Sequence, residues 1–165
     1  MDNIIIFTAK YLYLIEIALV AVYFFMQTRS KQKSIFVLSA LFLPLAYIVA
    51  QVIAALYFDS RPFVVGHFTP LILHAPDNGF PSDHMLFTSA IASILFVYNK
   101  KVGTVAWVIA LIVGVSRVYA GIHHLTDIVG SAIIVIVSMW IAQKYMLPQV
   151  AKTKLYKRYF EPQSL

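Results

Sequence analysis

The chain has 165 residues, of which 61% are apolar, and a mean hydropathy of +0.80, which excludes an ordinary soluble domain and leaves room for one membrane domain over residues 1–165. The net charge of +6 would suggest nucleic-acid binding in a soluble protein, but the Lys and Arg residues cluster at the ends of apolar runs, so we expect no nucleic-acid partner. With no cysteine, the chain has no disulfide and no thiolate metal site.

Five apolar segments predict an all-α, polytopic membrane bundle with about five spans. The first covers residues 4–26 and is expected to be a retained anchor, because no basic residue precedes its apolar run and no Ala-x-Ala site follows it. Glu16 interrupts it, either paired inside the bundle or facing a water-filled cavity. The next segments are 34–58, with a kink at Pro44, and 82–98, with Ser82 as N-cap; residues 102–119 and 125–147 complete the set.

The basic residues predict which ends of the spans share a side. Five spans place the basic loop 29–33, the turn at Lys100 and Lys101 and the basic tail 148–165 on one side, which the positive-inside rule assigns to the cytoplasm. The long polar connection 59–81 and the junction 116–127 then lie outside. These two outer segments contain only Arg61 and Arg117 as Lys or Arg residues, so we expect both to have a function there.

The junction 116–127 has the most polar chemistry in an otherwise apolar region. Arg117 cannot lose its charge, and its donors suit a phosphate group. Asp127 lies one helical turn after both His123 and His124, and a carboxylate at this spacing can hold one imidazole nitrogen as a donor. The other nitrogen then keeps a free lone pair, as a nucleophile or base needs. The spacing alone leaves His123 and His124 as alternatives.

The outer connection supplies complementary groups. Arg61 offers a second guanidinium, and His84 lies in the first turn of the third span, where free backbone N–H groups attract an anion. Two arginines, a helix N-terminus and two histidines are what phosphoryl transfer without a metal requires. We therefore expect neither a metal nor another cofactor.

Three short motifs carry a family resemblance. Arg61-Pro62, Pro81-Ser82-Asp83-His84 and Ser116-Arg117 followed by His123 and Asp127 resemble the three signatures of the type 2 phosphatidic acid phosphatase superfamily. The chain is most similar to the bacterial undecaprenyl-diphosphate phosphatases of the bacitracin-resistance kind, which often have Asp at the position of Asp83. The resemblance covers residues 61–130.

The resemblance implies a membrane lipid phosphatase that hydrolyses a polyprenyl diphosphate, such as undecaprenyl diphosphate, to the monophosphate and phosphate, in cell wall biogenesis and bacitracin resistance. It implies a site facing the outside of the cytoplasmic membrane. The alternatives are a phosphatidate or phosphatidylglycerophosphate phosphatase, or a catalytically impaired lipid-phosphate-binding member. A diphosphate is favoured because it leaves as a phosphate monoester, which is a better leaving group than a lipid alkoxide.

The resemblance also implies the role of each site residue. His123 would be the nucleophile that forms a phosphohistidine, because the family has five residues between the Arg and this His. Asp127 would orient it, and His84 would be the general acid. The phosphate-binding residues would be Arg61, Arg117, Ser82 and Asp83.

One departure from the family pattern concerns charge. The family has a Lys seven residues before the first Arg, and this chain has Ala54 there. Lys10, His67 and His74 are candidate accessory residues that would replace the missing cation. The carboxylate of Asp83 would repel a phosphate unless its charge is neutralised. It would either pair with an Arg or act as a hydrogen-bond partner that positions His84.

Two other classes of function remain open from the residues alone. A zinc hydrolase would use His84, His123, His124 and Asp127, although two arginines in the same site would repel the metal. A transporter is disfavoured because the charged residues lie at span ends and not at mid-bilayer depth. The apolar loop 63–73 is expected in the headgroup layer, where it would help a lipid substrate to enter.

Overall fold

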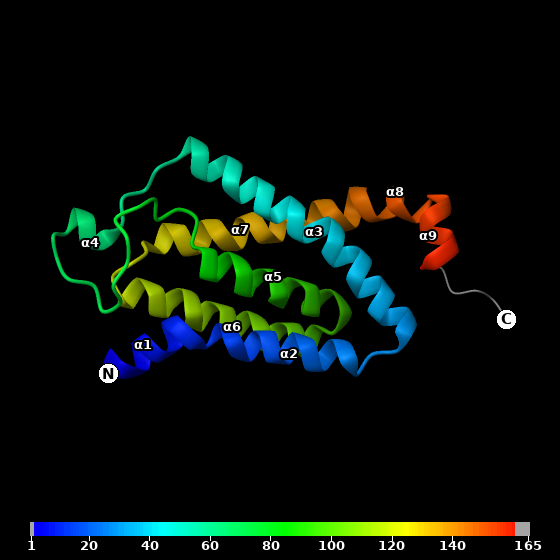
Figure 1. The fold of residues 1–165 in the computed structure, drawn as a ribbon, viewed down its shortest axis with the longest axis horizontal. Coiled ribbons are helices and arrows are strands. Elements are labelled where there is room, and N and C mark those ends of the chain that lie inside the picture. Colours follow the sequence, from blue (N-terminus) through cyan, green and yellow to red (C-terminus); the bar gives the residue numbers. More distant parts are fainter. Residues whose placement is uncertain (1, 161–165) are drawn as a thin grey trace.

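The structure, a computed structural model, describes residues 2–160, and the regular elements of these residues are all helical (Figure 1). Outside the helices, an isolated antiparallel bridge joins Ser60 to Asn78. The helices are α1 (Asp2–Tyr11), α2 (Tyr13–Phe25), α3 (Arg29–Leu56), α4 (Pro62–Val65), α5 (Asp83–Tyr98), α6 (Lys100–Tyr119), α7 (Leu125–Ile141), a π-helical turn (Ala142–Met146), α8 (Leu147–Ala151) and α9 (Lys154–Tyr159). The predicted all-α class is confirmed.

The first apolar segment is bent and not one straight span. The α1 and α2 helices meet at Leu12 with an angle of 41° between them. Before the bend, the Thr8 hydroxyl donates to the backbone carbonyl of Ile4 and also lies 2.7 Å from Ser116 Oγ on α6. A threonine hydroxyl that forms hydrogen bonds both to a carbonyl of the preceding helical turn and to a neighbouring helix favours a local bend.

The second segment begins earlier than the sequence indicates. Thr28 is the N-cap of α3, so Arg29, Lys31 and Lys33, expected in a loop, lie in the first turns of the helix. Because Thr28 caps the helix, α3 begins at Arg29, which the charges of the basic residues do not predict. Helix α3 continues through Pro44, and the kink expected at this residue stays a prediction.

Helix α5 is the centre of the bundle. It packs most extensively on α6, then on α7, and most of its residues from Met85 to Leu95 are buried. Small residues allow this close approach, because a Cβ added at Gly103 of α6 would lie 2.1 Å from the Phe96 Cα. With 16 residues, α5 is about 24 Å long, shorter than the ~30 Å hydrocarbon core of a bilayer.

The other helices have the length and the surface of membrane spans. Three are long and apolar enough to cross, namely α3, α6 and the continuous stretch from α7 through α8, and the bent pair α1–α2 makes a fourth. With the short α5, this agrees with about five spans. The outward residues of α6 and α7 are large and apolar: Val105, Val108, Leu111, Ile112, Val115, Ile133, Ile136, Val137 and Trp140 are all exposed.

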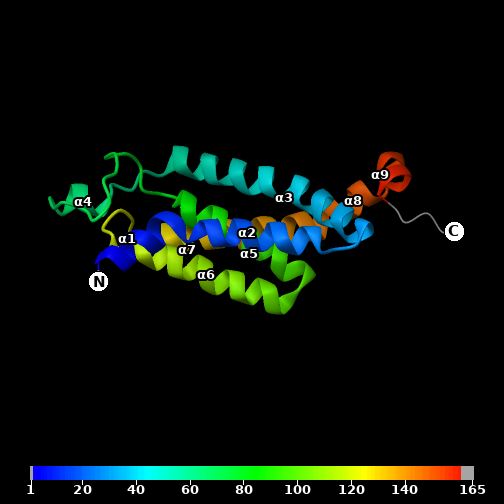
Figure 2. The ribbon, with the colours of Figure 1, turned by 60° about the horizontal axis from the view of Figure 1, so that its bottom comes forward.

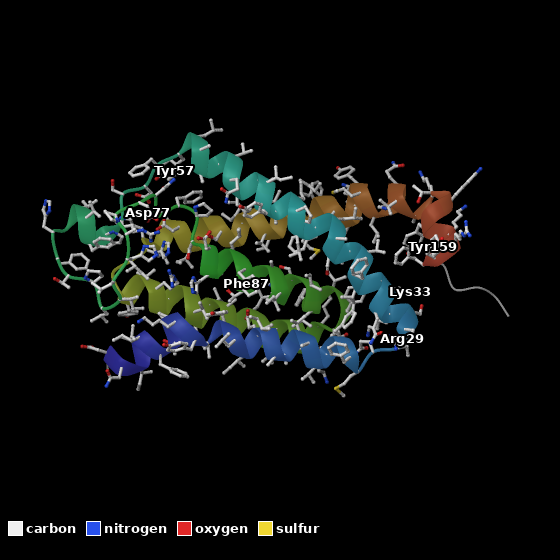
Figure 3. All side chains as sticks on the ribbon, viewed as in Figure 1. Arg29, Lys33, Tyr57, Asp77, Phe87 and Tyr159 are labelled. Carbon is white, nitrogen blue, oxygen red and sulfur yellow. The ribbon has the colours of Figure 1, made fainter. Side chains whose placement is uncertain are left out.

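The two ends of the bundle differ in chemistry (Figure 1). The connection with α4, the start of α5 and the α6–α7 junction gather at the end where α1 begins. Arg29, Lys33 and Tyr159 lie at the opposite end from Tyr57 and Asp77 (Figure 3), and the Lys33 ammonium donates to the Tyr159 carbonyl at 2.7 Å. The segments that the basic residues assigned to one side therefore do gather at one end.

Candidate active site

His123 lies between α6 and α7 and is 2% exposed. Its Nδ1 lies 3.1 Å from Asp127 Oδ2, and because a carboxylate only accepts, Nδ1 carries the proton and Nε2 keeps the lone pair. The same carboxylate oxygen accepts from the His124 backbone N–H at 2.9 Å, which ties Asp127 to the start of α7. The sequence spacing thus produces a fixed imidazole with a defined tautomer.

Arg61 faces the free nitrogen of this imidazole. Its Nη1 lies 3.4 Å from His123 Nε2 and donates to the Ile122 carbonyl at 2.8 Å. Its Nε donates to Asp77 Oδ1 at 2.6 Å, and Nη2 donates to the Asn78 carbonyl. The guanidinium is 5% exposed and held on three sides, so one of its donors stays beside the lone pair of His123.

Two buried donors near these groups have no protein acceptor. Arg117, on the last turn of α6, donates through Nη1 to the Ala9 carbonyl at 3.3 Å, but its Nε has no hydrogen-bond partner within residues 2–160. Ser82 is the N-cap residue of α5, as predicted, yet its buried hydroxyl makes no capping bond and has no partner in the described part of the chain. Unsatisfied buried donors are costly and suit an anion.

His84 lies in the first turn of α5 and is half-buried. Its ring packs edge-on against the Tyr13 ring, with 5.3 Å between centroids, and its charged form would be repelled by Arg117 and His123. Asp83 is exposed at the first position of α5, and its charge interacts electrostatically with the charge of Arg117. Among the described residues it forms no ion pair within 4.0 Å, so neither suggested direct pairing of Asp83 is present.

The structure brings one of the three candidate accessory residues to the cluster. The His74 ring lies 6.4 Å from the His123 ring, and His74 Nδ1 is 3.7 Å from Asp77 Oδ1. Lys10 and His67 are exposed, and no hydrogen bond or ion pair of their side chains is found within residues 2–160. Ala54 lies in the last turn of α3, where its carbonyl accepts from Asn78 Nδ2 at 3.1 Å.

The His124 side chain has a partner outside the cluster. Its Nε2 lies 3.0 Å from the Ser60 carbonyl. The four residues of the zinc alternative therefore do not converge, and no group of three His, Asp or Glu side chains within residues 2–160 is arranged to hold a metal ion.

Several residues at the site were not singled out from the sequence. Asp77 pairs with Arg61, and the Asn78 side chain closes the loop by accepting from the backbone N–H groups of Asp59 and Phe80. Gly79 lies against Asp127, since an added Cβ would be 3.2 Å from its Oδ2. The sequence Asp77-Asn78-Gly79 is typical of a tight turn, but it does not predict contact with Arg61 and Asp127.

Asp59 lies beside Asp127 and was also missed. Thr126 Oγ1 donates to Asp59 Oδ2 at 3.5 Å, and Asp127 Oδ1 has no hydrogen-bond partner in the described part of the chain. Burial raises the pKa of Asp59, and so does the charge of Asp127. A protonated Asp59 would be a donor for that neighbouring carboxylate.

The surroundings of His123 keep its imidazole neutral. Burial lowers the pKa of His123; the hydrogen bond that its Nδ1 donates to Asp127 opposes this, but the charges of Arg117 and Arg61 lower the pKa further. For Asp77, burial alone would raise the pKa, but the hydrogen bond and charge of Arg61 outweigh it and lower the pKa. The site thus combines a neutral, oriented imidazole with two fixed cations.

Beside His123 and His124 is a pocket of about 400 Å³, lined also by Phe68, Tyr119 and Leu125.

Comparison with known proteins identifies the family. The family model of the PAP2 superfamily matches residues 33–150, which is well over half of the chain. The chain belongs to the PAP2 superfamily. This confirms the resemblance carried by the three motifs and, with it, the predicted class of activity, a phosphatase acting on lipids of a membrane.

Individual PAP2 relatives cover most of the chain. It is 33% identical to the undecaprenyl-diphosphatase BcrC of Bacillus subtilis (strain 168), over 83% of this chain and 70% of that protein. It is 29% identical to the bacitracin transport permease protein BcrC of Bacillus licheniformis, over 87% and 73% of the two chains. The putative undecaprenyl-diphosphatase YbjG of Escherichia coli (strain K12) is 30% identical over 96% and 79%. No solved structure matches the chain significantly.

Proposed function

We propose that the protein hydrolyses a polyprenyl diphosphate to the monophosphate and inorganic phosphate, with His123 as the nucleophile. The observation that carries this proposal is the buried His123, held by Asp127 at Nδ1 and facing Arg61 at Nε2. An imidazole that keeps its lone pair beside a fixed guanidinium suits attack on a phosphorus atom whose oxygens the guanidinium binds.

The first step forms a bond from His123 Nε2 to the terminal phosphorus. The bond from that phosphorus to the bridging oxygen breaks, and the leaving lipid monophosphate takes the proton of His84, which becomes neutral. Arg61, Arg117 Nε, the Ser82 hydroxyl and the N-terminus of α5 would bind the equatorial oxygens. Asp83, next to the Ser82 donor, would limit how much extra negative charge the site accepts.

The second step returns the enzyme to its starting state. Water attacks the phosphohistidine, His84 accepts the proton of the water, and the bond between phosphorus and Nε2 breaks to release phosphate. Asp127 holds the imidazole in one orientation throughout. The two guanidinium groups supply the positive charge that a metal ion would supply in other phosphatases, so we propose a metal-independent reaction.

The choice of a diphosphate rests on the relatives and on leaving-group chemistry. Two of the three relatives described above are named as undecaprenyl-diphosphatases, one of them putative. Because a phosphate monoester leaves easily, the site can do without the cation that is missing at Ala54. The alternative, a glycerophospholipid phosphate, is raised by the phosphatidylglycerophosphatase B of Bacillus subtilis, which is 34% identical over 74 residues.

We also propose that the site faces the outside of the cytoplasmic membrane and that the C-terminal tail is cytoplasmic. The basic residues at the opposite end of the bundle support this orientation. On the outer side, Val65, Phe68 and Leu73 of the loop 63–73 are exposed and apolar, as expected for a segment in the headgroup layer.

Phosphate release from a panel of lipids tests this proposal. The purified protein, with EDTA present, is offered undecaprenyl or farnesyl diphosphate, phosphatidate and phosphatidylglycerophosphate. We expect the diphosphates to be hydrolysed fastest. Faster release from a glycerophospholipid would overturn the substrate, loss of activity with EDTA would overturn metal independence, and no release from any lipid would indicate an impaired, binding-only member.

A further inference from the structure

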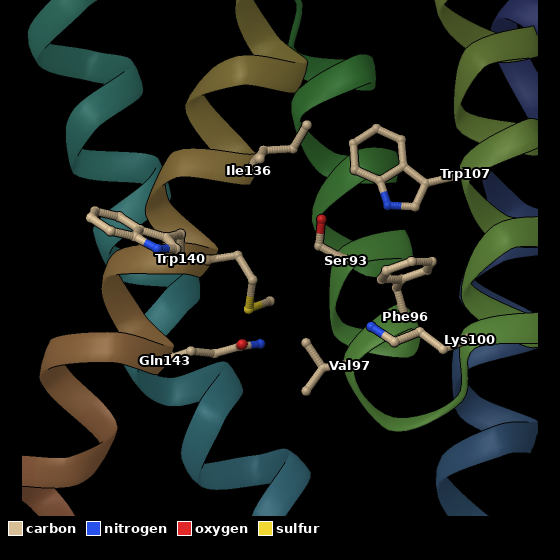
Figure 4. Close-up of a pocket in the computed structure, with 9 residues that line it drawn as sticks. Ser93, Phe96, Val97, Lys100, Trp107, Ile136, Trp140 and Gln143 are labelled. Atoms are coloured by element: carbon tan, nitrogen blue, oxygen red, sulfur yellow. The ribbon is translucent and has the colours of Figure 1, made fainter.

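A second cavity lies at the basic end of the bundle, far from His123. It has a volume of about 480 Å³, within the range of small-molecule sites, and opens between α5, α6 and α7 (Figure 4). It forms because α6 leans away from α7 toward the α5–α6 turn (Figure 2), which leaves part of α5 uncovered. Its lining residues are Ser93, Phe96, Val97, Lys100, Trp107, Ile136, Met139, Trp140 and Gln143.

The lining changes from apolar to polar along the cavity. Trp107 and Ile136 lie at the end of the cavity farther from the α5–α6 turn, and Lys100 and Gln143 lie at the end near that turn (Figure 4). The Lys100 ammonium is 3.9 Å from the centre of the Phe96 ring, so it is held at the mouth. Gln143 belongs to the π-helical turn, a feature that often marks functional sites, and points into the cavity (Figure 4).

A buried polar group aimed into this cavity has no protein partner. Ser93 is 6% exposed, its hydroxyl points into the cavity (Figure 4), and no hydrogen bond of this hydroxyl is found within residues 2–160. Neither Lys100 Nζ nor the Gln143 amide has a hydrogen-bond partner in the described part of the chain. Lys100 and Gln143 at one end of an apolar wedge, with Ser93 between them and the apolar end, match an amphiphile with an apolar chain and a polar head.

The charge at this end selects the head group. Lys100 lies at the mouth, Lys101 follows it in the first turn of α6, and the Lys144 ammonium is 4.7 Å from the Trp140 ring. Every aspartate of the chain precedes the long α3 or lies at the His123 end, and Glu16 is buried in α2. Within residues 2–160, the basic end therefore has no carboxylate to neutralise its cations.

From these observations we propose that this wedge binds an anionic phospholipid of the adjoining leaflet. Its phosphate lies at Lys100, its ester groups lie near Gln143 and Ser93, and one acyl chain runs along Trp107 and Ile136. The bound phospholipid has a regulatory or anchoring role and is distinct from the substrate at the opposite end. Its binding does not depend on the proposed reaction.

The two tryptophans of the chain make this proposal directly measurable, because both line the wedge. In a Trp140→Phe background, Trp107 is the one remaining tryptophan. The protein is placed in phosphatidylcholine vesicles that contain a fixed fraction of phosphatidylglycerol, with bromine atoms on the acyl chains of one lipid or the other. Bromine quenches tryptophan only at close range.

We expect brominated phosphatidylglycerol to quench Trp107 at a mole fraction roughly fivefold lower than brominated phosphatidylcholine, the factor expected for one lysine beside an anionic head group. Lys100→Gln should abolish the difference. Lys101→Gln is the matched control, since Lys101 is exposed on the same turn but does not line the wedge, and it should keep the preference.

Three outcomes would overturn the proposal. Equal quenching by both lipids shows no selective site, and equal loss in Lys100→Gln and Lys101→Gln shows only a general attraction to the basic surface. Quenching by neither lipid, together with cross-links between copies through α6 and α7, shows that a second copy of the chain covers the wedge. Gel filtration of each variant in detergent verifies that it is folded.

Discussion

At the scale of single residues, the environment of His123 determines how activity depends on pH. Burial and the charges of Arg117 and Arg61 lower the pKa of His123 more than the hydrogen bond of Asp127 raises it. Only the neutral imidazole has a lone pair to attack with. The reactive form therefore persists below the ordinary histidine pKa of about 6.5.

We predict that the acidic limb of kcat/KM lies below about pH 6.5, because that limb reports the base of the free enzyme. Arg61→Gln removes one of the charges that lower the pKa, so the limb should move to higher pH while the rate falls. Phosphate release measured from pH 4 to 8, in roughly the range where histidine titrates, checks this. Lys101→Gln, at the other end of the bundle, should leave the limb in place; a limb that shifts equally in both variants would contradict the assignment.

A second residue-scale prediction concerns Asp59. If protonated Asp59 donates to Asp127 Oδ1, an amide can replace it and a methyl group cannot. Asp59→Asn should keep most activity, and Asp59→Ala should lower kcat about tenfold, as expected for one hydrogen bond to a charged group. Steady-state rates on the diphosphate distinguish the two. Equal losses in both variants would show that the Asp59 side chain acts in another way.

The site residues differ in how far the sequence could predict them. His123, Asp127 and Arg117 lie in one short segment, where helical spacing and chemistry are visible together. The selection of His123 over His124 needed the family pattern, and the structure gives a physical reason, since His124 turns to the Ser60 carbonyl. Asp59 and Asp77 could not be predicted as site residues, because their partners come from chain folding and not from spacing.

At the scale of helices, Glu16 is the feature of α2 that stability measurements can test. Its carboxyl group is fully buried, and neither oxygen has a hydrogen-bond partner within residues 2–160. It is therefore not paired inside the bundle, which was one of the two arrangements expected from the sequence. A buried carboxyl without a partner destabilises a membrane helix.

We predict that Glu16→Leu raises the unfolding temperature in detergent, which corresponds to a gain in the free energy of unfolding on the order of 2–3 kcal/mol. Glu16→Gln should give a smaller rise. Differential scanning fluorimetry of the purified variants measures this. A lower unfolding temperature in Glu16→Leu would mean that the carboxyl has a stabilising partner. Loss of activity with a raised unfolding temperature would give Glu16 a functional role.

The helices themselves were largely predictable, because apolar runs of sufficient length have few alternatives to a membrane helix. Their ends were not. The start of α3 at Arg29 depends on the Thr28 cap, and the bend at Leu12 depends on the contact of Thr8 with Ser116 of a distant helix. Hydropathy also could not show that α5, the shortest of the five membrane segments, would be the most enclosed one.

At the scale of the whole molecule, the separation of the two ends predicts a fixed orientation in the membrane. The chain has no cysteine, so single cysteines can be added at the exposed positions Ala75 and Lys101 without background labelling. In intact cells, Ala75→Cys should react with an impermeant maleimide, and Lys101→Cys should react only after lysis. The reverse pattern would place the His123 end in the cytoplasm.

The central claim, nucleophilic attack by His123, is best tested by trapping the phosphohistidine. His84→Ala should allow attack on a diphosphate, whose leaving group needs little protonation, but should slow the attack of water, so the intermediate accumulates. Because His84 packs on Tyr13 and not on His123, its loss should leave the His123–Asp127 pair in place.

The measurement uses a diphosphate radiolabelled at the terminal phosphate, an alkaline quench and peptide mapping. We predict acid-labile label on His123 in His84→Ala, its loss when His123→Ala is added, and its retention when His124→Ala is added instead, with gel filtration verifying that each variant is folded. Label that survives His123→Ala, or that disappears with His124→Ala, would contradict the assignment of His123 as the nucleophile.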